Sequence, residues 1–327
     1  MNELDQALDS YLAVRRALGF KLDKAERLLR KFVEHAQGLQ SSFVTTAMAL
    51  DWVNQSNKLS PAARADHLSV VRGFAWHLHA SNPRHEVPPA NLIPCHRVRH
   101  QPYIYSDEDV AALVEAAQDI RYPLKAATYA TLFGLLAVTG MRVGEARALD
   151  RGDVDWNEAL LVIRNSKFQK SREVPLHRTT IRALHVYADQ RDEFFHRPRT
   201  PSLFVNRAGT RLNKSNVHDN FQKLLQRTGL SQRHPRPRIH DLRHSFAVNT
   251  IRRWYEAGLE VEPRLPSLST YLGHVGPSST YWYLTATPDL MALASKRLER
   301  TLGKLPGPPW RLCYNRSSSN GSSGNNV

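Results

Sequence analysis

Cysteine is scarce in this sequence, and no hydrophobic run is long enough to cross a membrane. The two cysteines, Cys95 and Cys313, stand in no CxxC or Cys/His spacing, which excludes a disulfide framework and argues against a zinc site. The most apolar stretch, residues 126–141, is shorter than the about 20 residues that span a bilayer. The first ten residues carry three acids and no apolar segment, unlike a secretory signal. We therefore expect a cytoplasmic protein in a reducing compartment, with no membrane partner.

Acidic residues are few relative to basic ones. The 327 residues include 45 Lys and Arg against 30 Asp and Glu, which gives a net charge of +15 and a pI near 10.1. The excess is uneven, because residues 201–250 hold nine Lys and Arg but two Asp, whereas residues 101–150 are acidic overall. Such a balance predicts a polyanionic partner, and nucleic acid is the first candidate.

The length and composition are those of a two-domain globular protein. Apolar residues make up 41% and charged residues 23% of the chain, which excludes a disordered or fibrous protein. Helical apolar spacing runs through the first hundred residues in four segments, and Ser60 before Pro61 is a typical helix start. Prolines and a basic stretch then interrupt the pattern. We predict a helical domain over residues 1–93 and a linker over residues 94–105.

A second domain is expected over residues 106–304. Ser106 followed by three acids predicts a helix N-terminus, and helical spacing continues to Gly140. Two apolar runs, residues 159–164 and 172–176, flank the sequence SKFQK and predict a β-hairpin.

After one short strand, the second domain is predicted to be helical from about Lys214 to Arg300, with breaks at prolines. The strand is expected at residues 203–205, before a helix that starts near Lys214. The last residues, 305–327, end in Ser, Asn and Gly and are expected to form a disordered tail. The predicted fold class is mainly α with a small β-hairpin, an α+β arrangement.

Arg142 and Glu145 follow the apolar segment, in TGMRVGEARAL, at a spacing that places them on one face of a helix. Taken alone, such a pair is most often a surface salt bridge worth about 0.3–0.5 kcal/mol. The functional alternative is an arginine that Glu145 holds toward a phosphate, whose non-bridging oxygens match the guanidinium fork. These residues by themselves leave both interpretations open.

Two further short motifs carry side chains that can act on a phosphate. His240 and Arg243 share one face of a helix predicted after a proline-rich loop, where acid/base work or anion binding is favoured over metal ligation. Gly273 and His274 indicate a tight turn at a helix end. Tyr283 stands nine residues after His274, and such a tyrosine is more often part of an aromatic core cluster.

Taken together and in this order, these residues resemble the tyrosine recombinase (phage integrase) family. The resemblance covers about residues 1–300: a helical core-binding domain, then a catalytic domain with T-G-x-R-x-x-E, a hairpin lysine before V-P-L, H-x-x-R, L-G-H and a tyrosine nine residues on. The YWYLTATP segment looks like that of recombinases from transposons and other mobile elements. The resemblance implies a site-specific enzyme that breaks and rejoins DNA in integration, recombination or transposition.

The resemblance also implies a role for each residue of the motifs. Tyr283 is the nucleophile that attacks a backbone phosphate and leaves a 3′-phosphotyrosyl bond. Arg142 and Arg243 bind the non-bridging oxygens of that phosphate, and His274 adds a hydrogen bond. His240 acts as general base or orients the tyrosine, whose ordinary pKa of about 10 otherwise leaves it protonated.

Two of the implied roles have more than one candidate residue. The general acid is either Lys167 or Lys170, and the family pattern counted back from V-P-L selects Lys167. The nucleophile is one of Tyr271, Tyr281 and Tyr283, and the spacing from L-G-H selects Tyr283. The implied catalytic set is Arg142, Lys167, His240, Arg243, His274 and Tyr283.

The implied partner is double-stranded DNA at a specific recombination site. The family works as a homotetramer on DNA, and sibling recombinases of the same element are further expected partners. No cofactor or metal is expected, because arginines and histidines stabilise the phosphate. The alternative is a catalytically silent DNA-binding accessory protein of the same fold, against which all six intact family positions argue. A relaxing topoisomerase of the same chemistry is a third hypothesis.

Overall fold

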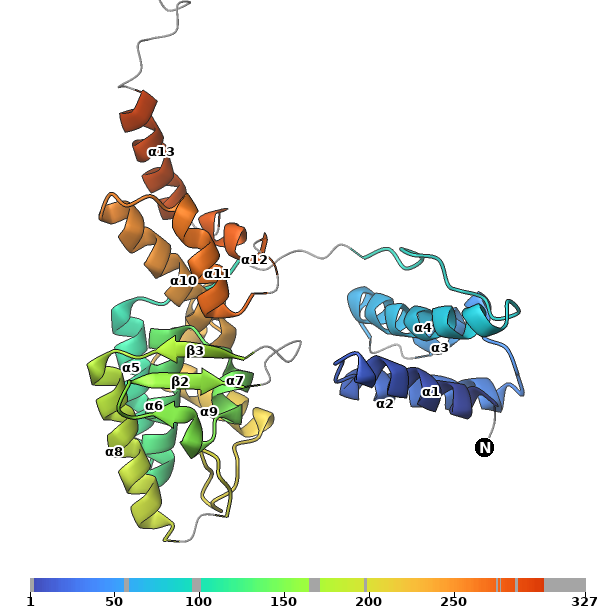
Figure 1. Ribbon diagram of the computed structural model, residues 1–327, viewed down its shortest axis with the longest axis horizontal. Helices are drawn as coiled ribbons and strands as arrows, with labels where there is room; N and C mark the ends of the chain where they lie inside the picture. The colour runs from blue at the N-terminus through green and yellow to red at the C-terminus, as the bar shows by residue number, and fades with distance from the viewer. Residues whose placement is uncertain are drawn as a thin grey trace, which may run out of the picture. The chain divides into compact units, whose positions relative to one another are not determined.

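The computed structural model describes residues 3–55, 59–95, 101–164, 171–196, 199–274, 276, 278–285 and 288–302 (Figure 1). The chain divides into two compact units, the second of which starts at Gln101. The expected tail and both candidate lysines of the hairpin lie outside the described residues. No helix in the described part of the chain is long and apolar enough to cross a membrane.

The first unit consists of four helices around an apolar core. Leu8, Phe32 and Phe74 come from different helices and are fully buried in it. The Ser60 side chain accepts a hydrogen bond from the Ala63 N–H at 3.3 Å, which confirms the predicted helix start. The four helices are α1 (Glu3–Ala17), α2 (Asp23–Gly38), α3 (Thr46–Asn54) and α4 (Pro61–Ser81).

The second unit opens with three helices, α5 (Asp107–Gln118), α6 (Pro123–Thr139) and α7 (Val143–Ala148). Ser106 and Asp109 form the reciprocal hydrogen bonds of a capping box at the start of α5, as predicted. Because α6 is apolar on most of its surface, it lies in the core of this unit, in contact with α5, α8 (Arg178–Phe194) and α10 (Ile239–Glu256).

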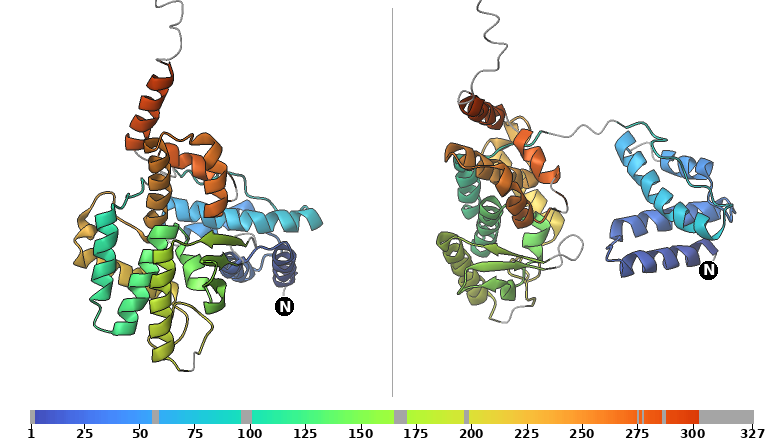
Figure 2. Two further views of the ribbon diagram at one scale, coloured as in Figure 1. Left: turned by 60° about the vertical axis from the view of Figure 1, so that its left-hand side comes forward. Right: turned by 45° about the horizontal axis from the view of Figure 1, so that its top comes forward.

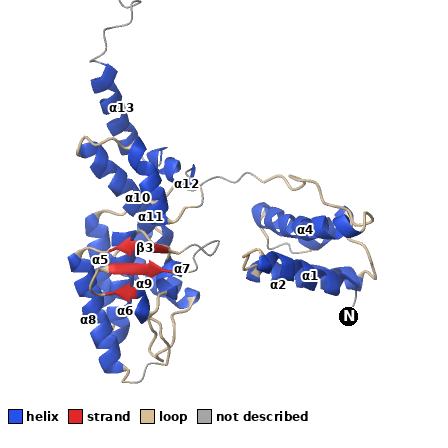
Figure 3. Cartoon of the chain, viewed as in Figure 1, coloured by secondary structure: helices blue, strands red, loops and turns tan. Residues whose placement is uncertain are grey.

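A small antiparallel sheet follows, with strand order β1-β2-β3. Figure 3 shows its strands side by side among the helices. Leu161 of β2 pairs with Val154 on one side and Val174 on the other, and all three are buried. The predicted hairpin is confirmed, whereas two-residue β1 is too short to leave a periodic signal. The strands are β1 (Val154–Asp155), β2 (Leu160–Ile163) and β3 (Arg172–Pro175).

Two features of the next region differ from the sequence-based expectation. The predicted strand at residues 203–205 is wrong, because this segment makes isolated bridges at Ser202 and Val205 and no ladder. Its apolar side chains are buried in the core, which explains the hydrophobic run without a strand. The long helix α8 (Arg178–Phe194) is not predicted from the sequence.

Helices make up the remainder of the second unit. Helix α10 contacts both α6 and α13, and α13 extends away from the sheet (Figure 2). The Tyr105 N–H donates to the Ser245 hydroxyl on α10 at 2.8 Å, which attaches the start of this unit to its core. The predicted fold class, mainly α with a small sheet, is confirmed. The helices are α9 (Lys214–Arg227), α10 (Ile239–Glu256), α11 (Leu265–Leu272), α12 (Ser278–Tyr281) and α13 (Pro288–Leu302).

Candidate active site

Arg142 lies in the tight turn between α6 and α7. Gly140 ends α6 with a left-handed φ of 61°, and a Cβ there would come within 2.5 Å of the Phe246 ring, so the turn requires glycine. Arg142 itself is extended and caps α7, so it shares no helical face with Glu145, contrary to the prediction. Glu145 instead folds back and accepts a hydrogen bond from the Arg142 backbone N–H at 2.9 Å.

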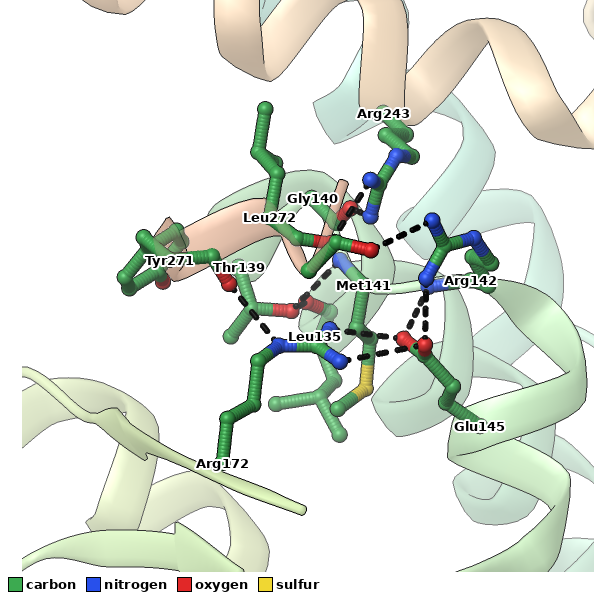
Figure 4. Close-up of polar contacts among 11 residues, drawn as sticks. Leu135, Thr139, Gly140, Met141, Arg142, Glu145, Arg172, Arg243, Tyr271 and Leu272 are labelled. Atoms are coloured by element: carbon green, nitrogen blue, oxygen red, sulfur yellow. Dashed lines mark hydrogen bonds and ion pairs between the residues drawn. The ribbon is translucent and has the colours of Figure 1, made fainter. Parts of the chain in front are cut away.

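The Arg142 side chain is held by two partners (Figure 4). Its Nη1 donates to Glu145 Oε1 at 2.7 Å, and its Nη2 donates to the Gly273 carbonyl oxygen at 2.9 Å. The Arg142 side chain is 29% exposed, but that of Glu145 is 8% exposed. The pair is therefore no ordinary surface salt bridge: a buried carboxylate orients a guanidinium that still reaches solvent.

Arg243 is buried on the inner face of α10. Its side chain donates to the Gly140 carbonyl at 3.0 Å and to the Leu272 carbonyl at 2.7 Å. Burial, followed by the charge of nearby Arg142, lowers the pKa of Arg243 to about 10, so it stays protonated at neutral pH. Two guanidinium groups held this close repel each other and favour an anion beside them.

His274 follows the turn that ends α11. Gly273 takes a left-handed φ of 67° there, and the His274 Nδ1 lies 2.7 Å from the hydroxyl of fully buried Thr280. Burial and the charges of Arg243 and Arg142 lower the pKa of His274 to about 4. His274 is therefore neutral at pH 7, and when Nδ1 accepts from Thr280, Nε2 carries the proton that can be donated to a phosphate oxygen.

His240 is the second residue of α10 and is solvent-exposed. Partial desolvation and the positive charges of Arg243, Arg142 and Arg238 lower its pKa below the ordinary value. Desolvation and the three arginines act in the same direction, so each lowers the pKa of His240. A neutral imidazole at pH 7 can accept a proton. Its ring packs edge-on against that of His244 at 4.7 Å.

Tyr283 is 2% exposed and lies beside these groups. Its ring stacks on His274 with centroids 6.0 Å apart, and it is near enough to Arg243 to affect the pKa of that residue. The alternative Tyr281 is 48% exposed. Tyr271 is partly buried, stacks on the Phe246 ring and packs against both the main core cluster and the cluster that contains Tyr283. Tyr283 also belongs to a buried apolar cluster, so the core-packing interpretation describes part of its surroundings.

The structure thus gathers five of the six predicted residues around one turn, and Lys167, like Lys170, lies outside the described residues. Three neighbours are not predicted from the sequence: Arg172, His244 and Thr280. His244 lies 5.5 Å from the Tyr283 ring, centroid to centroid, and its spacing of four from His240 on one helix was an available signal. Arg172 is a charged residue at the start of a short strand and is followed by charged Glu173, so neither Arg172 nor Thr280 carried a distinctive signal.

The arrangement is suited to an anionic group. A cavity of about 970 Å³ lies between α6 and α8, and none of the site residues lines it. No group of three or more His, Cys, Asp and Glu among the described residues could hold a metal ion. Two guanidinium groups and two neutral imidazoles beside a phenol can bind a phosphate and present a nucleophile to it.

Comparisons with known proteins agree with this geometry. Residues 104–289 match the model of the phage integrase family. Over 309 residues the chain is 42% identical to "Putative integrase/recombinase y4rB" of Sinorhizobium fredii, which covers 92% of this chain and 98% of that protein. It is 29% identical over 264 residues to tyrosine recombinase XerC of Haemophilus ducreyi, with 79% of each chain covered.

Solved structures share the fold. The Tn1549 transposon integrase in complex with transposon right end DNA matches with a TM-score of 0.62 at 16% identity, covering 91% of this chain and 99% of that one. A lambda integrase tetramer bound to a Holliday junction matches with a TM-score of 0.55 at 17% identity, covering 86% of this chain and 76% of that one. The ordered motifs, the fold and the close relative lead to one conclusion: the chain belongs to the phage integrase family of tyrosine recombinases, which are DNA-binding proteins of recombination.

Proposed function

We propose that this protein is a site-specific DNA recombinase that cleaves and rejoins DNA through a 3′-phosphotyrosyl intermediate. The observation that carries the proposal is the gathering of Arg142, Arg243, His274 and Tyr283, which come from four separate segments of the chain. The net charge of +15 supports DNA as the substrate.

In the proposed reaction, the Tyr283 hydroxyl oxygen attacks the phosphorus of a scissile phosphodiester. The bond from phosphorus to the 5′-oxygen breaks as the 3′-phosphotyrosyl ester forms. Lys167 gives the departing 5′-oxygen its proton, which leaves a free 5′-hydroxyl. The 5′-hydroxyl of a second duplex then attacks the phosphotyrosyl phosphorus and returns its proton to Lys167. This step rejoins the strands and releases Tyr283, so no cofactor or metal is consumed.

The other side chains stabilise charge during this exchange. Arg142 and Arg243 neutralise the non-bridging oxygens, whose charge grows in the transition state, and His274 donates a hydrogen bond to one of them. His240 accepts the tyrosine proton or orients the phenol. Because Tyr283 is almost fully buried in the free protein, DNA binding has to expose its hydroxyl.

The proposed assembly is a tetramer that joins two duplexes through a Holliday junction in the cytoplasm. The helical domain (residues 1–93), the linker (94–105) and the catalytic domain (106–304) would clamp each site, with sibling recombinases as further partners. The lambda integrase tetramer on a Holliday junction supports this assembly, and the Tn1549 integrase on transposon DNA supports a role in a mobile element.

The test selects the DNA site and traps the intermediate together. The protein is incubated with a library of randomised duplexes that carry a nick, so that cleavage releases a short fragment and leaves the adduct trapped. DNA that stays attached to the protein after SDS denaturation is sequenced and used as the substrate. Tyr283→Phe should bind this DNA with nearly unchanged affinity and form no adduct, whereas Tyr281→Phe should form the adduct normally.

The competing hypotheses give different results in the same assay. An adduct that survives in Tyr283→Phe and vanishes in Tyr281→Phe would identify Tyr281 as the nucleophile. A wild-type protein that binds selected DNA but forms no adduct is the silent accessory protein. Relaxation of supercoiled plasmid without a selected site would indicate a topoisomerase.

A further inference from the structure

Arg172 is a buried arginine that the proposed reaction does not use. It is the first residue of β3, and its side chain is 10% exposed. Its Nη1 and Nη2 donate to the two carboxylate oxygens of Glu145 at 3.1 and 2.8 Å, and its Nε donates to the Tyr271 carbonyl at 2.8 Å (Figure 4). One guanidinium thus joins the sheet to both α7 and the end of α11.

Glu145 is shared between two arginines through these contacts. It accepts from the backbone and Nη1 of Arg142 as well as from both terminal nitrogens of Arg172. Burial alone would raise the pKa of Glu145, but hydrogen bonds from Arg172 and Arg142 hold it at about 2. One negative charge therefore faces two positive ones, and Arg142 has to share it.

Arg172 also supports the turn that precedes His274. A Cβ on Gly273 would lie 2.7 Å from Arg172 Nη1, so the guanidinium packs directly against this glycine. The carbonyls of Leu272 and Gly273 in the same turn accept from Arg243 and Arg142. The position of Arg172 therefore affects both phosphate-binding arginines and the histidine that follows.

A purely structural ion pair is a weak explanation for this arginine. Replacing a buried ion pair by apolar residues of similar volume is often neutral or stabilising, because the desolvation of both charges is then avoided. An arginine with three directed donors is better explained by the orientation that it imposes on its partners.

We propose that Arg172 is a positioning residue that sets the orientation of Arg142, through Glu145, and of the Leu272–His274 turn for phosphate binding. The proposal rests on the proposed recombinase function. Without Arg172, Glu145 has Arg142 as its remaining arginine partner and competes fully with the phosphate for it. Misplacing a phosphate-binding group by about 1 Å costs on the order of 10²-fold in rate, so Arg172→Met should slow cleavage by roughly 10- to 100-fold at saturating DNA.

The test measures single-turnover adduct formation on the selected DNA, together with DNA affinity and thermal unfolding. The variants are Arg172→Met, Glu145→Gln and the double variant. Arg164→Met is the matched control, because Arg164 also lies at the end of a strand of the sheet and pairs with an acid, Asp153, at 2.7 Å, but is 61% exposed. Arg172→Met should cleave slowly with DNA affinity nearly unchanged, and Arg164→Met should cleave like the wild type. In the Glu145→Gln background, Arg172→Met should cost much less, because no carboxylate then competes for Arg142.

A second substrate separates positioning from general destabilisation. A methylphosphonate at the scissile position replaces one charged non-bridging oxygen by methyl and reduces the need for arginine charge. The defect of Arg172→Met should shrink on this substrate relative to wild type. If Arg172→Met does not fold, Arg172→Lys, which keeps the charge but loses the bidentate geometry, takes its place in the same comparison.

Two results would overturn the inference. One is wild-type cleavage by the folded variant; the other is an equal defect on both substrates together with no coupling to Glu145→Gln. Either result leaves the proposed function intact, because that proposal fails when the wild-type protein itself forms no adduct.

Discussion

The two units of the molecule place their charged residues differently. In the first unit, ion pairs such as Arg30 with Glu26 lie on the surface, where the arginine side chain is 45% exposed. Among the described residues of that unit, His85 is the one buried polar side chain. The second unit buries Glu145, Asp241 and Arg243.

The contrast separates exposed ion pairs from buried charges, among which are those of the candidate site. An exposed ion pair contributes about 0–1 kcal/mol, whereas a buried charge costs several kcal/mol of desolvation unless its partners are well placed. The first unit is therefore held together by apolar packing, and replacing its exposed paired charges should change its stability little. In the second unit the buried charges stand in fixed positions, which is what phosphate binding in the proposed reaction requires.

The largest difference in cleavage rate between the two units is expected for two arginine substitutions. Arg243→Ala removes a guanidinium that binds the phosphate in the proposed reaction, and it should lower the cleavage rate by about 10²–10³-fold. Arg30→Ala, on the surface of the first unit, should cleave like the wild type. Single-turnover adduct formation on selected DNA measures both. Equal rates for the two variants would show that burial of Arg243 serves packing alone.

A smaller difference is expected between two glutamates. The folded-state pKa of Glu145 lies at about 2, below its ordinary value, so its ionised form stabilises the fold above pH 4.5 and that contribution is lost as the pH falls through about 2. Glu145→Gln should therefore lower the free energy of unfolding by about 3 kcal/mol at pH 7, and by less at pH 3. Denaturant unfolding at several pH values tests this.

Glu26→Gln is the matched control for that experiment. Hydrogen bonds from Arg30 and Arg16 lower the pKa of Glu26, but this carboxylate is only partly buried at the surface, where water screens the interaction. Its replacement should change stability little at any pH. A pH-independent loss in Glu145→Gln would contradict the ionic role assigned to Glu145.

The proposed general acid gives a contrast within the second unit. Lys167→Ala should lose about 10²-fold in cleavage of normal DNA, because an alkoxide leaves poorly without a proton. Sulfur in place of the bridging 5′-oxygen leaves as a thiolate without help, so this substrate should rescue Lys167→Ala but neither Arg142→Ala nor Arg243→Ala. Rescue of Lys170→Ala, with Lys167→Ala near normal on both substrates, would move the assignment along the hairpin.

The smallest effect is expected from two glycines. Gly140 has a left-handed φ of 61° and faces the Phe246 ring, so Gly140→Ala should cost about 1–3 kcal/mol of stability. Gly38 ends α2 with no heavy atom near the position of a Cβ, and Gly38→Ala should be neutral or stabilise by up to about 1 kcal/mol. Thermal unfolding measures the stability of both variants. Similar shifts in Tm would show that the turn before Arg142 can adjust to a side chain at position 140.

Local signals along the chain were sufficient for most of the architecture. Helix starts at Ser60 and Ser106 and the hairpin of β2 and β3 are confirmed, because caps and apolar periodicity depend on residues close in sequence. The apolar run at residues 203–205 led to a wrong prediction, because hydrophobicity alone does not distinguish a strand from an irregular buried segment. The ordered motifs indicated the family and five residues that the fold gathers.

Contacts between distant segments could not be predicted in this way. Arg142 reaches Gly273 across 131 positions, Arg243 reaches Gly140 across 103, and Arg172 reaches Glu145 across 27. Residue types along the chain indicated which side chains can bind a phosphate. Their protonation, orientation and shared partners depend on burial and on the through-space charges of neighbours, and these exist only when the folded chain has excluded water and brought the segments together.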